Sequence, residues 1–64
     1  MKLDDAKKKL AEIALDELGK EFTQYFNAQT GGVPNAAQHF ETGVKVLLAT
    51  EASALEIVSR LVKD

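Results

Sequence analysis

Cysteine and tryptophan are absent from this sequence, and proline occurs once, at Pro34. Without cysteine, neither a disulfide nor a thiolate metal site can stabilise the chain. The longest uninterrupted apolar run, residues 46–49, is far shorter than the roughly 20 residues that span a membrane. The first residues carry no apolar signal core, so we expect a cytoplasmic protein with no membrane partner.

No strong excess of either charge is present. The chain carries 8 Lys and Arg residues against 10 Asp and Glu residues, a formal net charge of −2. Nucleic-acid-binding domains usually carry a strong positive excess, so no nucleic-acid partner is expected. The one basic run, residues 7–9, is flanked by Asp4, Asp5 and Glu12, and we interpret it as a solvated helix surface.

The chain is also short. With 64 residues it forms one domain at most, and we expect a single helical domain over residues 1–64. A domain of this size buries only about 60% of the surface that its unfolded chain exposes. Its stability then requires very regular packing, or a partner or second copy that adds to the core.

Good helix formers dominate the first half and predict a helix over about residues 3–29. Asp4 can cap its start. Its apolar residues form two stripes, rotated by roughly 130° from each other. Gly19 lies near the changeover, so the helix either continues past it and touches two neighbours, which we favour, or breaks there. The first stripe contains Leu3, Ala6, Leu10 and Ile13, and the second contains Leu15, Leu18, Phe22, Tyr25 and Phe26.

A cleaner pattern predicts a second helix over about residues 35–63. Its apolar stripe keeps its phase for about 25 residues, which favours one helix that passes through Gly43. A break near Thr50, which could act as an N-cap, is the alternative. The stripe contains Ala37, Phe40, Val44, Leu47, Leu48, Leu55, Val58, Leu61 and Val62.

Residues 30–34 separate the two patterns and read as a turn. Gly31 and Gly32 are suited to the end of the first helix, because glycine tolerates the left-handed conformation found there. Asn35 is a good N-cap, and Gln38 can reach back to it in a capping box. A nucleotide-binding loop would need a preceding strand, more glycines and a lysine, so we interpret this segment as a turn.

Candidate catalytic residues are scarce. His39 is the only histidine, and no cysteine is present for it to activate. Ser53 and Ser59 lie about 21 Å or more along the same predicted helix, too far to form a catalytic pair with it. The neighbouring helical positions of His39 hold no usual zinc ligand. We therefore predict no enzymatic activity, no cofactor and no metal site.

Glu51 is the most informative polar residue, since it lies in the middle of the second apolar stripe. Either a local helix break exposes it, or it is a polar specificity element that contacts a ligand or partner. Val46 and Ile57 widen the same stripe on the side of His39 and Thr50. The candidate interaction residues are therefore His39, Val46, Thr50, Glu51 and Ile57.

The segment "AQHFETGVKVLLAT", residues 37–50, resembles a helix of small phage helical-hairpin proteins that sequester cyclic nucleotides to counter bacterial immune signalling. The shared features are a histidine–aromatic pair, a glycine three residues later and an apolar run. The tryptophan or methionine and the basic residue expected next are absent. The overall layout, ending in "SALEIVSRLV", is also similar to small co-chaperones of secretion needle subunits. No functional residue is carried over from either family.

These observations predict an all-α fold, a helical hairpin that dimerises into an antiparallel four-helix bundle. The alternative is a three-helix monomer with a break near Gly19 or Thr50. The expected function is a non-enzymatic protein-binding module, such as a small regulator, adaptor or chaperone, that binds another protein, itself as a homodimer, or both. The alternative is a protein that sequesters a small ligand between protomers, near His39 and the Gly31–Asn35 turn.

Overall fold

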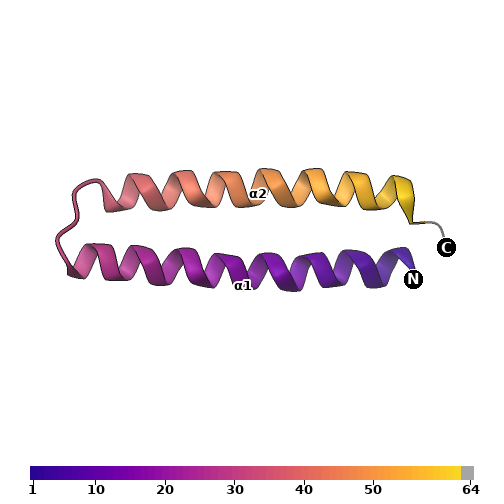
Figure 1. The fold of residues 1–64 in the computed structure, drawn as a ribbon, viewed down its shortest axis with the longest axis horizontal. Coiled ribbons are helices and arrows are strands. Elements are labelled where there is room, and N and C mark those ends of the chain that lie inside the picture. The colour runs from indigo at the N-terminus through magenta and orange to yellow at the C-terminus, as the bar shows by residue number, and fades with distance from the viewer. Residues whose placement is uncertain (63–64) are drawn as a thin grey trace.

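The computed structural model describes residues 1–62 and consists of two antiparallel helices joined by a short turn (Figure 1). α1 spans Leu3–Thr30 and α2 spans Ala36–Leu61. The end of α2 lies beside the start of α1, and the molecule measures 49 × 15 × 8 Å. The predicted all-α hairpin is confirmed. The expected end of the second helix at Lys63 lies outside the described residues.

Neither helix breaks at the position where the sequence allowed a break. α1 continues through Gly19 and α2 through Thr50, so the described residues form two helices and not three. A glycine within a helix costs only about 1 kcal/mol, which packing over several turns can offset. The N-cap of α1 is Lys2, without a side-chain hydrogen bond, and Asp4 lies inside the first turn. The predicted capping role of Asp4 is therefore wrong. Within the described residues, no helix is long and apolar enough to cross a membrane.

α1 ends in a Schellman motif, as its two glycines indicate. Gly32 has a φ of 71°, in the left-handed region that glycine adopts without strain. The amide of Val33 donates a hydrogen bond to the carbonyl of Ala28 at 2.9 Å, and the amide of Gly32 donates one to the carbonyl of Gln29 at 3.2 Å. These two bonds satisfy carbonyl groups that the end of the helix would otherwise leave unpaired.

Asn35 is the N-cap residue of α2, but it does not act through its side chain. Its backbone is left-handed, with φ 61° and ψ 26°, and its side chain makes no capping hydrogen bond. The predicted capping box with Gln38 is therefore wrong. The carbonyl of Asn35 accepts a hydrogen bond from the amide of His39 at 3.0 Å. Asparagine suits this position because it tolerates the left-handed conformation better than most residues with a side chain.

The helices pack along a seam of paired positions. The rings of Tyr25 and Phe40 stack near the turn, with centroids 4.8 Å apart. Further along, Glu21 lies over Gly43, where a side-chain carbon would come within 2.8 Å of the Cδ atom of Glu21. Small residues at the seam let two helices approach closely, and here Gly43 leaves room for the Glu21 side chain. Other residues of the two helices that line the same hollows along the seam are Ala28 with Ala36, Leu18 with Leu47, Ala14 with Glu51, and Leu10 with Ala54.

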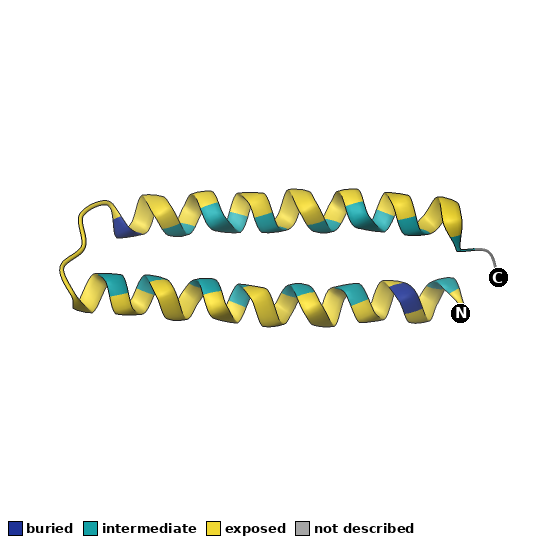
Figure 2. Cartoon of the chain, viewed as in Figure 1, coloured by how far each residue is buried: buried dark blue, intermediate teal, exposed yellow. Residues whose placement is uncertain are grey.

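The seam buries very little. Among the described residues, the buried apolar side chains are Ala6 and Ala36, at 7% and 4% exposure, and no large side chain is fully buried. Figure 2 shows half-buried residues only where the helices face each other, and exposed residues on the rest of both helices. The accessible surface is 5016 Å². A compact monomer of 7.0 kDa would expose about 4,000 Å².

We predict that Asn35→Gly preserves stability within about 0.5 kcal/mol, whereas Asn35→Ser lowers the free energy of unfolding by about 1 kcal/mol. Glycine adopts the left-handed backbone freely and serine does not. Urea unfolding followed by circular dichroism, at one fixed protein concentration, measures both variants. Because serine is as good a side-chain cap as asparagine, a stable Ser variant would instead indicate side-chain capping.

Candidate interaction surfaces

The hairpin has two broad sides, one on each side of the seam, and both carry exposed apolar residues. We name one the aromatic face and the other the second face. The aromatic face consists of Leu15, Leu18, Phe22, Phe26 and Leu48. The second face consists of Ile13, Val46, Thr50, Ile57 and Leu61.

The aromatic face is built by both helices. Leu15 and Leu18 of α1 line a shallow hollow together with Leu48 of α2, which places all three on one side of the seam. Phe22 and Phe26 follow Leu18 at intervals of four residues and therefore continue the same side of α1 toward the turn. The exposed fraction is 68% for Leu15, 56% for Phe22, 59% for Phe26 and 56% for Leu48.

The second face is narrower and is carried mainly by α2. Ile13 of α1 and Thr50 of α2 line a hollow on this side. Val46 precedes Thr50 at helical spacing, and Ile57 and Leu61 follow it. On α1 this side is polar, with Glu17 next to Ile13. Lys20 donates a hydrogen bond to Glu17 at 3.0 Å on the helix surface. Apart from Ile13, the exposed apolar residues of this side therefore form a strip along α2.

Most of the predicted interaction residues lie on the side of the hairpin that carries the second face. Val46, Thr50 and Ile57 belong to the second face, and Val46 and Ile57 are 59% and 43% exposed. His39 lies on the same side, nearer the turn. Glu51 is separate, because it lies in the seam, is half-buried and lines hollows on both sides of it.

Sequence reasoning did not select the aromatic face as an interaction site. The signal was present in the second apolar stripe of α1, which points away from the first stripe and includes Phe22 and Phe26. Leu48 could not be separated from the main stripe of α2 by periodicity alone. Its 56% exposure shows that it lies beside the seam rather than in it.

The residues that share hollows with Glu51 are mostly apolar, and the polar ones are Thr50 and Glu17. Leu18 and Leu48 lie with it on one hollow, and Ile13 and Thr50 on the other. Among the described residues, its carboxylate takes part in no ion pair or hydrogen bond. The helix is continuous through this position, so the alternative of a local break that exposes Glu51 is wrong. The Glu51 side chain is half-buried at the seam and lines an open hollow on each side of it.

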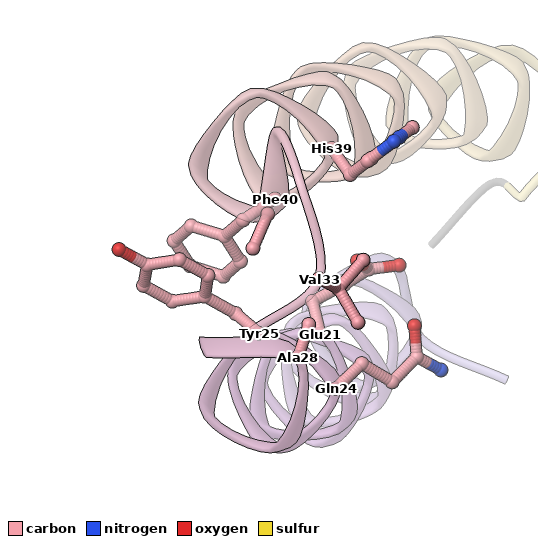
Figure 3. A pocket seen from close by; sticks show the side chains of 8 residues that line it. Glu21, Gln24, Tyr25, Ala28, Val33, His39 and Phe40 are labelled. Atoms are coloured by element: carbon pink, nitrogen blue, oxygen red, sulfur yellow. The ribbon is translucent and has the colours of Figure 1, made fainter. Parts of the chain in front are cut away.

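A third hollow, of about 220 Å³, lies beside the turn. Figure 3 shows the Tyr25 and Phe40 rings side by side at one side of it, with Val33 of the turn between the helices. Glu21 and His39 contribute a carboxylate and an imidazole. Typical ligand pockets hold roughly 300–1,000 Å³, so this hollow is below the usual size for a complete site.

Comparisons of this chain with protein-family models, with curated proteins and with solved structures find no match.

We predict that Glu51→Leu raises the free energy of unfolding by about 1 kcal/mol, because a half-buried apolar side chain replaces a carboxylate between apolar neighbours. Glu51→Gln should have a smaller effect. The matched control is Glu56→Leu, which makes the same exchange at an exposed position of α2 and should change stability by less than about 0.5 kcal/mol. Thermal and urea unfolding at one protein concentration compare the three. A destabilised Glu51→Leu variant would indicate a partner for the carboxylate.

Proposed function

We propose that this protein is a non-enzymatic protein-binding module, a small regulator, adaptor or chaperone, and that it works as a homodimer in which two hairpins form a four-helix bundle. The observation that carries the proposal is the exposure of large apolar side chains on both sides of a seam that fully buries none of them. Monomeric soluble proteins rarely expose contiguous apolar surface of this kind unless it is an interaction site.

The surface area supports a second copy. A compact protein of twice the 7.0 kDa chain mass would expose about 6,700 Å². Two separate hairpins expose 5016 Å² each. Pairing them into such a bundle would bury about 3,300 Å² in total, which lies in the range of roughly 2,000–5,000 Å² found for obligate homodimers. A four-helix bundle is the arrangement in which two amphipathic hairpins cover each other's apolar residues.

A homodimer that covers one side leaves the other for a different protein. The strip along α2 supports that role, since Val46 and Ile57 are exposed and Leu61 is 75% exposed. An amphipathic helix of the partner could dock there through apolar residues at helical spacing. This division, with one side for self-association and one for a partner, is the layout that a small adaptor or chaperone requires.

Sequestration of a small ligand is the second candidate, and the hollow beside the turn favours it. That hollow combines an imidazole, a carboxylate and the Tyr25–Phe40 ring pair within one end of the hairpin. The hollow holds about 220 Å³. If residues of a second protomer closed its open side, the combined cavity would have the size of an ordinary ligand pocket. His39→Ala would then abolish ligand binding and leave the dimer intact.

We predict that the protein is dimeric in solution. Light scattering at tens of micromolar should give twice the 7.0 kDa mass of one chain. The urea midpoint should rise with protein concentration, because folding and pairing are then coupled by mass action. A helical protein with the mass of one chain, and a urea midpoint independent of concentration, would contradict the homodimer.

We also predict that a partner protein binds to the second face. A protein captured from the native host should bind the purified dimer, and Val46→Glu should weaken that binding at least tenfold, since a charge replaces an exposed apolar contact. Thr23→Glu, on the outer side of α1, is the control and should leave the affinity unchanged. Equal binding by both variants would place the partner elsewhere, and a bound small molecule in place of a protein would favour the sequestration function.

A further inference from the structure

We infer that the aromatic face, and not the second face, is the surface on which a second copy of this chain docks. This inference rests on the proposed homodimer and goes beyond it by naming the interface. The two faces both carry exposed apolar residues, so the choice between them depends on how continuous each apolar surface is, what charges interrupt it and whether its shape can fit a copy of itself.

Continuity favours the aromatic face. Leu15, Phe22 and Phe26 come from α1 and Leu48 comes from α2, each more than half exposed, so the apolar surface crosses the seam and covers both helices. Stacking one hairpin on another requires apolar contacts from both helices of each copy. On the second face, the α1 side is occupied by Glu17, which forms an ion pair with Lys20. On that side α1 contributes Ile13, and α2 supplies the other exposed apolar residues.

The distribution of charged residues also favours the aromatic face as the dimer interface. The chain carries a formal net charge of −2, so two copies repel each other weakly, and charged groups buried at the contact would add a desolvation cost. The residues from Ala11 to Phe26 that continue the aromatic face along α1 are uncharged. On α2, Lys45 and Glu41 lie three and seven residues before Leu48, border the face and form a solvent-exposed ion pair at 3.3 Å, and Glu51 lines its recess. A second copy can therefore cover the aromatic face without burying an unpaired lysine or arginine.

The face also has the shape that self-pairing needs. In a symmetric dimer, the same surface must supply both the projections and the recesses. The large side chains Phe22 and Phe26 are the projections. The hollow bounded by Ala11, Leu15 and Leu48 is a recess of about 260 Å³ on the same face. Large residues of one copy can thus pack against small ones of the other, as in a well-packed protein interior.

The first test compares two matched variants of the full chain. Phe22 and Val46 are 56% and 59% exposed, on opposite sides, and each is replaced by glutamate. Because Phe22 is lost twice from a symmetric interface, Phe22→Glu should raise the dimer dissociation constant at least about 100-fold. Val46→Glu should leave it within about threefold. Sedimentation velocity over a dilution series measures both constants.

A second test avoids variants that weaken the fold. The chain contains no tryptophan, so a single introduced tryptophan reports on its own surroundings. Phe22→Trp should show emission at shorter wavelength and low acrylamide quenching in the dimer, and both should change toward the values of exposed tryptophan as the dimer dissociates on dilution. Val46→Trp should behave as an exposed tryptophan at every concentration.

The outcomes separate the two proposals. If the unaltered chain is monomeric at all concentrations, the homodimer itself is wrong. If the chain is dimeric but Val46→Glu dissociates it while Phe22→Glu does not, and the Val46→Trp emission is the one that responds to dilution, the homodimer stands and the assignment of its interface to the aromatic face is overturned. A dimer that neither glutamate variant dissociates would also overturn that assignment.

Discussion

The thinness of the hairpin is the constraint on which the rest of the structure depends. Two helices have only one line of contact, and here that line includes Gly43 and the buried alanines Ala6 and Ala36. Small residues bring the helices close together but contribute little apolar area, since burial stabilises in proportion to the area removed from water. The larger apolar residues lie beside the seam, where a single hairpin cannot cover them. This is the reason for proposing a second copy that covers them.

The same thinness explains how two carboxylates can lie in the seam. Glu21 is half-buried against Gly43, and Glu51 is half-buried opposite Ala14. In a thick core, an unpaired carboxylate would cost several kcal/mol. Here each side chain has a small neighbour across the seam and an open hollow beside it, so water can reach the carboxylate. These positions make the seam tolerant of charge but also limit how much it can stabilise the hairpin.

The fold was predictable from the sequence because its signals are local. Helix formers, an apolar stripe with constant phase and a Gly-Gly-Val-Pro turn place both helices within a few residues of their observed ends. The role of Asn35 was not predictable, because asparagine is favoured both as a side-chain cap and in the left-handed backbone, and sequence does not reveal the sign of φ. That Phe22 and Leu48 lie on the same side of the seam depends on how the helices are rotated against each other, and that rotation is a tertiary property.

The position of Glu51 links the two sides of the molecule. Its hollows open on both the aromatic face and the second face. In the proposed homodimer, a second copy would cover the aromatic face and leave open the hollow beside Ile13 and Thr50. A protein that docks on the second face closes this remaining hollow. That protein must then supply a hydrogen-bond donor or a cation to Glu51, because a carboxylate sealed among leucines and alanines without a partner opposes the association. A lysine or arginine within an otherwise apolar helix meets this requirement, and it would make recognition depend on a residue that the hairpin does not need for its own stability.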